Sequence, residues 1–470
     1  MKGFKAAYIM SALGIFLLLS IMIAGRSVYE KTRTLNGPVS MQKISVSVKN
    51  HLDAEGSSLL SQKDADRIAE AMDGRLLTHT MQAALPVSFQ NNAIEARVIG
   101  TDSSYPLFHE VRLKSGGFLT RESGERGETV AVIEEDLAWQ LFNTENAVGN
   151  QIRLLGRTFR IIGVSAKDRS ILAGLSGDGT SNLYIPSQTF SGLDGDAEIS
   201  HFEVATTDDG TLGRNEDEIA KVLRSIGKNP AAYQIIDYNI ERARMEQKPH
   251  IVIFTIGFIM ILWTLFYIKT MVLQLLSFLK KESDTDYFRD MVRHNISRIL
   301  QTAGKTILAI LFILGVWQCI RFRFYIDPAL VPDELIDLSY YSGLVKESFQ
   351  KMAANTGYVA LYAELLFDKA RLLSGALFFA GFLPGLLLLF AGLSLFRKHS
   401  FAADRTFLIL GIQLLLWTGI LLLLSKVCGL QAAIDMRSFA VFCPFLLAGC
   451  VRKRFTRSGA ERGSKDRISG

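Results

Sequence analysis

The sequence is poor in cysteine, and its few cysteines lie outside the longest polar segment. Four cysteines occur among 470 residues, and all fall in or beside apolar segments of the C-terminal half: Cys319, Cys428, Cys443 and Cys450. None lies between Gly25 and His250. A domain in that segment must therefore be held by its own hydrophobic core, without disulfides. Cys/His spacings typical of zinc sites are absent as well. We expect the four thiols to pack against neighbouring helices.

Acidic residues are missing from the long apolar runs. The chain is 49% hydrophobic, and its apolar runs cover residues 6–24, 251–276, 306–320, 372–396, 407–424 and 439–451. Runs of this kind are typical of membrane spans. Ion-coupled transporters generally place ionisable groups near the bilayer centre, so the lack of Asp and Glu argues against a secondary transporter. The polar exceptions are Gln274, Gln318 and Gln413, which we expect to form hydrogen bonds between helices.

A catalytic constellation is missing too. The seven histidines are scattered without ligand spacing, and no Ser/His/Asp set can be assembled: His51, His79, His109, His201, His250, His294 and His399. Residues 303–306 read Ala-Gly-Lys-Thr, like the end of a phosphate-binding loop, but the first glycine of that motif would fall at Ile299. We therefore expect no enzyme activity, no metal, no cofactor and no nucleic-acid partner. ATP hydrolysis, if any, would come from a separate subunit.

The remaining patterns predict a multi-pass α-helical membrane protein with an α+β extracytoplasmic domain inserted after the first transmembrane helix. Lys2 and Lys5 precede the first run and no Ala-x-Ala site follows it, which favours an uncleaved anchor over a signal peptide. The expected divisions are an N-terminal helix at 1–26, the domain at 27–249, a membrane domain at 250–452 with about five spans (251–276, 304–322, 371–396, 406–426 and 436–452), and a basic tail at 453–470.

The domain itself mixes helix and strand signals. Ser61 and Asp64 form a capping box before a helix, and the alternation around Leu155-Gly156 predicts a hairpin. Residues 130–133 and 183–185 read as short strands, the second stopped by Pro186. We expect residues 215–218 to cap a further helix that ends at Gly227.

The distribution of basic residues predicts the orientation. Groups of Lys and Arg lie before the first run, between the second and third, between the fourth and fifth, and after the sixth. The positive-inside rule then places the N- and C-termini in the cytoplasm and residues 27–249 outside. Residues 327–368 also fall outside, as a shorter segment with one or two helices, while Arg321 and Arg323 count mildly against the scheme. The basic tail serves topology in this scheme, or attraction to anionic headgroups.

A set of motifs between residues 98 and 186 resembles the exported domain of the MacB/FtsX-like ABC transporter permeases. Their order matches an Arg-Leu-Lys-Ser-Gly-Gly-Phe segment at 112–118, an Asn-Ala-Val-Gly turn at 146–149, and a closing Tyr-Ile-Pro at 184–186. The residues that carry the resemblance are Gly116, Phe118, Asn146, Val148, Gly149, Phe159, Gly163, Tyr184 and Pro186. We interpret all of them as fold-making. Gly149 and Gly163 would release the chain at bends where a side chain would clash.

The resemblance implies a permease-type subunit that moves with a separate ABC ATPase and pairs with a second copy or another permease. Helices continuing from the first two spans, at 25–34 and 236–249, would carry the motion to the exported domain. Residues 280–304 lack the family's Arg-Glu-Ile-Gly-like segment, and five later spans stand where the family usually has three. An ATPase-independent membrane-anchored sensor or scaffold is the alternative.

One small-residue motif in the fourth span can hold helices close together. Gly381 and Gly385 are four residues apart, with Pro384 in the same turn. Such spacing allows close helix approach in a bilayer. The motif is either a seam between two copies or a packing contact within the chain.

Overall fold

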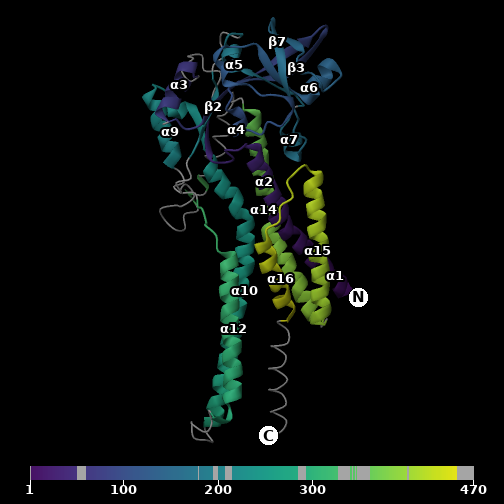
Figure 1. Ribbon diagram of the computed structural model, residues 1–470. Helices are drawn as coiled ribbons and strands as arrows, with labels where there is room; N and C mark the ends of the chain where they lie inside the picture. The colour runs from purple at the N-terminus through teal and green to yellow at the C-terminus, as the bar shows by residue number, and fades with distance from the viewer. Residues whose placement is uncertain are drawn as a thin grey trace.

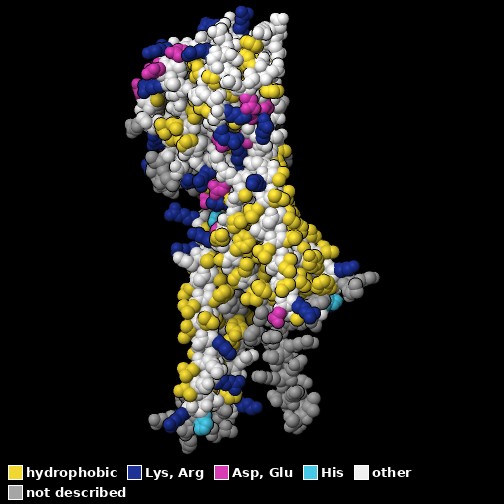
Figure 2. All heavy atoms as spheres, turned by 45° about the vertical axis from the view of Figure 1, so that its right-hand side comes forward, with side chains coloured by type: hydrophobic (Ala, Val, Ile, Leu, Met, Phe, Trp, Pro, Cys, Tyr) yellow, Lys and Arg dark blue, Asp and Glu magenta, His cyan; other side chains and the backbone are white. Residues whose placement is uncertain are grey.

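The computed structural model describes residues 2–49, 60–72, 74–177, 179–193, 199–206, 214–283, 293–326, 339–340, 342–343, 346, 360–399 and 402–451. A sheet-containing domain stands at one end of the molecule and long helices at the other (Figure 1). Hydrophobic side chains cover much of the helical part, whereas charged side chains gather on the domain and at the helix ends far from it (Figure 2). This distribution is that of a membrane region with a domain standing in water.

In the residues that the structure describes, the helical part contains six apolar helices. The first is continuous from Lys2 to Leu35, as α1 (Lys2–Leu19), a π-helical turn η1 (Ser20–Ala24) and α2 (Gly25–Leu35). The others are α10 (Tyr238–Ser283), α12 (Ile296–Ile320), α14 (Tyr362–Lys398), α15 (Ala403–Val427) and α16 (Met436–Val451). Five are long and apolar enough to cross a membrane, and α16 is a shorter apolar helix. The predicted fold class is confirmed.

The domain is built on one ten-stranded sheet. Its strands are β1 (Lys43–Val48), β2 (Leu77–Phe89), β3 (Asn92–Thr101), β4 (Leu113–Gly116), β5 (Val130–Glu134), β6 (Gln151–Leu154), β7 (Arg157–Ser165), β8 (Asn182–Pro186), β9 (His201–Ala205) and β10 (Tyr233–Asp237). The order is β10-β1-β9-β2-β3-β8-β5-β7-β4, and β6 pairs with both β2 and β7. The pairings β2–β3–β8–β5–β7–β6–β2 therefore close a ring, and β9, β1 and β10 extend it.

Short helices surround this sheet. They are α3 (Gln62–Ala71), α4 (Tyr105–Phe108), α5 (Arg121–Glu125), α6 (Glu135–Phe142), α7 (Ile171–Ser176), α8 (Ser187–Ser191), α9 (Arg214–Ser225) and the 3₁₀ turn η2 (Pro230–Ala232). The main core lies between them and the sheet, with Ile68 of α3, Leu137 of α6, Phe159 of β7 and Ile219 of α9 all buried.

Several local predictions are confirmed. The capping box at Ser61 and Asp64 starts α3. The β6–β7 hairpin turns at Leu155 (φ 47°) and Gly156 (φ 80°), and two successive positive φ values are typical of a tight type I′ turn. The strand β8 ends at Pro186 as expected.

Other local predictions are wrong or only partly right. Asn215 is not a cap: it lies inside α9, which is described from Arg214, and its amide donates to Asp237 at 3.1 Å. The helices α12 and α14 begin about ten residues before the apolar runs that predicted them. Most of residues 327–368 lies outside the described residues, and its described end belongs to the start of α14. Gln274 and Gln318 are exposed, and only Gln413 bonds between helices, donating to Tyr8 O at 3.2 Å.

Candidate functional site

The motif glycines have backbone roles. Gly116 has φ 74°, and a side chain there would collide with the carbonyl of Ile162. A Cβ on Gly163 would collide with the carbonyl of Gly117, so β4 and β7 can approach each other only through glycine. Gly149 has φ 92° with open space around it, so it permits the bend without avoiding a clash. A side chain would thus clash at Gly163 but not at Gly149.

The other motif residues divide between core and surface. Phe159 is fully buried, and Pro186 is the last residue of β8 and precedes α8. Phe118 lies 5.6 Å from Tyr184, ring centre to ring centre, within a small aromatic cluster. Asn146 and Val148 lie in the exposed loop before β6.

The glycines of α14 form a contact within the chain. A Cβ on Gly381 would lie 2.9 Å from Leu17 O, and one on Gly385 would lie 3.0 Å from Leu18 Cγ. Pro384, in the same turn, is exposed. From the other side, a Cβ on Gly14 of α1 would lie 2.5 Å from Leu389 N. The small-residue face therefore packs α14 against α1 at close range, and the structure uses it inside one chain.

Within the described residues, helices α2, α10 and α14 reach the domain, and the end of α15 also touches it, where Cys428 O accepts a hydrogen bond from Ile171 N at 2.9 Å. The helix α2 runs into the loop before β1, and α10 begins directly after β10 (Figure 1). Lys31 of α2 is buried, and its Nζ lies 3.2 Å from both Glu110 and Asp168 of the domain. The third helix, α14, presents Glu364 to the sheet, as described next.

Glu364 of α14 meets a row of polar side chains on β1 and β9. Its Oε1 accepts hydrogen bonds from Ser45 Oγ at 3.4 Å and from Ser47 Oγ, and lies 3.5 Å from His201 Nδ1. Ser47 Oγ is also 2.8 Å from His201 Nδ1. All four residues are buried. A carboxylate from a membrane helix is thus inserted into the sheet of the domain.

The same row continues into a buried ion-pair cluster around Glu203. Lys43 Nζ lies 2.9 Å from Glu203 Oε1, and His109 Nε2 lies 2.8 Å from Glu203 Oε2. Burial lowers the pKa of Lys43 and of His109, although Glu203 opposes both shifts. Burial would raise the pKa of Glu203, but His109 and Lys43 outweigh it and hold that pKa well below its usual range. The cluster keeps charge inside the domain next to the α14 contact.

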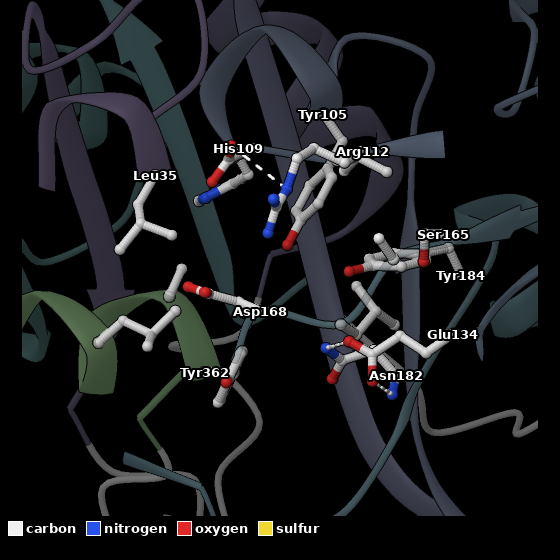
Figure 3. Close-up of a pocket in the computed structure, with 16 residues that line it drawn as sticks. Leu35, Tyr105, His109, Arg112, Glu134, Ser165, Asp168, Asn182, Tyr184 and Tyr362 are labelled. Carbon is white, nitrogen blue, oxygen red and sulfur yellow. Dashed lines mark hydrogen bonds and ion pairs between the residues drawn. The ribbon is translucent and has the colours of Figure 1, made fainter. Parts of the chain in front are cut away.

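A small cavity of about 60 Å³ opens beside this cluster, where the domain faces α2 and α14. Figure 3 shows the side chains that surround it. The hydroxyls of Tyr105 and Tyr184 point into it, Glu134 and Asn182 lie below them in this view, and Arg112 is among the lining side chains (Figure 3). Tyr362 of α14 completes the wall, so both the domain and a membrane helix line it.

The contact of α14 with β1, β9 and the Glu203 cluster, called the junction below, was not predicted from the sequence. His109, His201 and Glu203 are far apart in sequence from Lys43 and Glu364, and the scattered spacing of the histidines gives no sign that two of them meet. The only local signal is the alternation in β1, where Lys43, Ser45 and Ser47 share one face. That face reads as solvent-exposed, yet every residue of β1 is buried: Glu364 of α14 meets Ser45 and Ser47, and Lys43 lies against Phe108 and Tyr238. In the described part of the chain, no group of His, Cys, Asp and Glu is arranged to hold a metal.

Known proteins with similar sequences match this chain in the region of the domain. The family model of the MacB-like periplasmic core domain matches residues 9–222. The chain is 27% identical over 179 residues to Macrolide export ATP-binding/permease protein MacB 2 of Yersinia pestis, covering 37% of this chain and 26% of the relative. It is 26% identical over 149 residues to the MacB protein of Aggregatibacter actinomycetemcomitans, covering 32% and 23%. The chain thus spans about a quarter of the length of these curated relatives.

Solved structures of two bacterial domains also match part of the chain. The periplasmic region of MacB from Actinobacillus actinomycetemcomitans is 21% identical with a TM-score of 0.36, covering 44% of this chain and 92% of that one. The extracellular domain of the ABC-type transporter YknZ from Gram-positive bacteria is 16% identical with a TM-score of 0.34, covering 41% and 99%. The protein is therefore a membrane protein that carries a MacB-like periplasmic core domain, and in this domain it resembles the MacB-like ABC transporter permeases.

Proposed function

We propose that this chain is a permease-type subunit of a MacB/FtsX-like ABC transporter, in which the motion of a separate ATPase is transmitted to the extracytoplasmic domain for export or envelope remodelling. The observation that carries the proposal is the continuity of the helices. The first helix runs without a break from Lys2 to Leu35, and α10 is a single helix of 46 residues.

Such helices can act as rods. At ~1.5 Å per residue α10 is about 69 Å long, roughly twice the ~30 Å core of a bilayer. It begins in the sheet of the domain and ends in a hairpin with α12 that extends past α14, α15 and α16 on the far side (Figure 1). A displacement at the hairpin would therefore reach the domain along one continuous helix, which includes an interior proline, Pro249, near the domain.

The junction suits this role because α14 adds a third attachment. Glu364 lies in the sheet, while further along α14 the glycines hold α1. A shift of α1 relative to α14 would act on β1, both through Glu364 and through α2. The orientation that follows has the hairpin and both termini in the cytoplasm, with Lys280, Lys281, Arg298 and Lys305 around the hairpin. Its partners would be a separate ABC ATPase and a second copy or another permease, within the lipid bilayer.

The partner is tested by crosslinking in native membranes followed by purification of the tagged chain. We expect an ATP-binding cassette protein among the crosslinked products, and more of it with the intact chain than with one that lacks residues 280–304. A purification that recovers no such protein under efficient crosslinking would overturn the proposal.

Transmission is tested by breaking one rod. Three glycines inserted after Thr32 in α2 should uncouple the domain while leaving the ATPase bound, whereas the same insertion in the exposed loop at Thr144 should have no effect. The readout is the ATP-dependent change in distance between spin labels in the domain and in α15. Equal changes in both variants would contradict a rod mechanism.

The alternative, an ATPase-independent sensor or scaffold, has one observation in its favour. Residues 280–304 lack the segment by which the resembling permeases engage their ATPase. A neighbouring ATPase gene supports the transporter, and its absence supports the sensor.

A further inference from the structure

We propose that the junction cavity binds a primary ammonium group at the end of an aliphatic arm, as in a lysine side chain or a polyamine. The proposal goes beyond the transmission role and does not depend on it, because binding can be measured on the purified chain without any ATPase.

The first observation is a pair of tyrosine hydroxyls without partners. Tyr105 and Tyr184 are each only 7% exposed. Among the described residues, neither hydroxyl takes part in a hydrogen bond, and Figure 3 shows both directed into the cavity. Buried hydroxyls are normally hydrogen-bonded, so a pair left open toward one space indicates a site for a polar group.

The second observation is a buried carboxylate without a cation. Glu134 is 6% exposed and accepts hydrogen bonds from the backbone N–H of Asn182 at 3.1 Å and from its Nδ2 at 2.7 Å. No Lys or Arg of the described residues forms an ion pair with it. Burial raises the pKa of Glu134, although the bonds from Asn182 oppose this shift. An ammonium group in the cavity would supply the missing counter-charge.

The neighbouring charges decide between a cation and an anion. The other two acids that line the cavity already have cations: Lys31 lies 3.2 Å from both Glu110 and Asp168. The lining has two basic side chains, and both already have acidic partners: Arg112 is half-exposed and lies 3.4 Å from Glu110, and buried His109 lies 2.8 Å from Glu203. Glu134 is therefore the acid of the lining that has no ion pair among the described residues: Lys167 acts on it only from a distance, and Arg97 is joined to it through Asn182. The hydroxyl oxygen of a tyrosine can accept a hydrogen bond from an ammonium group, and the faces of the aromatic rings also attract cations.

The size of the cavity sets the shape of the ligand. About 60 Å³ holds an ammonium head with little more than its first carbons. A surface hollow of about 570 Å³ shares Glu110 and Val111 with the cavity and includes Pro38 and Pro106. An aliphatic arm can thus pass from the cavity along Val111 to a larger body in the hollow.

Binding here would bear on the membrane helices as well. Tyr362, Ala363 and Leu366 of α14 line the cavity, and Leu35 is the last residue of α2. A ligand held by Glu134 would touch the domain and two membrane-connected helices together.

The test is calorimetric titration of the full-length chain in nanodiscs with putrescine, Nα-acetyl-lysine amide, butane-1,4-diol and glutarate. We expect both or one of the amines to bind, and neither the diol nor glutarate. Preference for the lysine amide identifies a peptide as the source, and preference for putrescine identifies a free polyamine. Binding of glutarate without the amines, or of no probe, would overturn the proposal.

Matched variants locate the site. Glu134→Gln keeps the shape and removes the charge, and should weaken amine binding by roughly tenfold or more. Tyr184→Phe keeps the ring and should weaken it by about three- to tenfold. Glu122→Gln, at an exposed carboxylate of α5, should leave it unchanged. Thermal unfolding checks that each variant is folded. If Glu134→Gln does not fold, the binding measured with Tyr184→Phe tests the site instead. Unchanged binding in the folded variants would contradict the assignment.

Discussion

Several charged side chains at the junction are almost completely buried. Lys43 and Glu203 are 0% and 1% exposed, yet their charges are matched at 2.9 Å. Breaking such a pair by removing one member is costly, because the other charge is left buried without compensation. The cluster therefore gives the junction a fixed geometry, and it also makes it sensitive to protonation.

Acidification should weaken the domain through His109. Burial holds the pKa of His109 below its usual value of about 6.5, so below that pH the unfolded chain binds a proton that the folded chain resists. The free energy of unfolding should therefore fall as the pH drops from 7 toward 5. The thermal unfolding midpoint of the purified protein, measured across this range, reports the effect.

The control for this prediction compares the pH dependence of unfolding in the native protein and in a variant without His109. His109→Gln should flatten the slope in part, and the remainder should include His79, whose pKa burial also lowers. Glu134 contributes with the opposite sign, since its raised pKa favours the folded state at low pH, but it does so equally in both proteins. Identical slopes with and without His109 would show that the histidine does not titrate as argued.

Removing the carboxylate of Glu364 should loosen α14 from the sheet. Glu364→Ala leaves Ser45 and Ser47 without their acceptor in a buried site, which costs about 1–3 kcal/mol. Limited proteolysis and the thermal midpoint should both report a less stable junction. Asp368→Ala, at a half-exposed carboxylate one turn further along α14, is the matched control. A loss of similar size in that control would remove the special role of Glu364.

For single residues, the sequence predicts those structural roles that depend only on nearby residues in the chain. Ser61, Gly156 and Pro186 were placed correctly because a cap, a tight turn and a missing N–H act within a few residues. His201 and Glu364 could not be paired in this way, because their contact depends on which helix lands on which strand.

Among the helices, α1 and α14 pack against each other at close range. Backbone atoms of Leu389 and Ser11 face Gly14 and Gly392 at distances that no side chain would tolerate. In a bilayer, packing of this kind holds helices together where hydrophobic burial gives little. The contact thus fixes how the first span sits against the helix that carries Glu364.

A side chain at Gly14 should force these helices apart. A Cβ there would lie 2.5 Å from Leu389 N, a backbone atom that cannot rotate away, so Gly14→Leu should cost at least about 2 kcal/mol. Gly411→Leu on α15 meets nothing within 4 Å and should be tolerated. The thermal midpoint in detergent and the yield of monodisperse protein measure the effect. Equal behaviour of the two variants would argue against a tight contact.

Helices and hairpins were the part of the fold that periodicity and length could predict. The apolar runs identify the spans, but their ends differ because polar first turns, such as Tyr362 to Asp368, carry no hydropathy signal. The ring of strands could not be read from sequence, since β6 pairs not only with its hairpin neighbour β7 but also with β2, which lies much earlier in the chain.

For the whole molecule, the side of the membrane on which the domain stands is the decisive prediction. In a variant without the four native cysteines, Lys63→Cys should react with an impermeant maleimide in intact cells. Lys281→Cys should react only after the cells are opened. Both positions are exposed, so access alone decides the outcome. Labelling of Lys281→Cys in intact cells would reverse the orientation and with it the transmission role.

The neighbouring positions of β1 and β10 have a consequence for how such proteins can change. These strands are the first and last of the domain, and they pair directly, with Ile44 opposite Asp237. The chain therefore enters and leaves the domain at the same spot, between α2 and α10. A different folded module with adjacent ends, or merely a short turn, could be joined there without disturbing the helices below. The same helical part could therefore carry a different exported domain in place of this one.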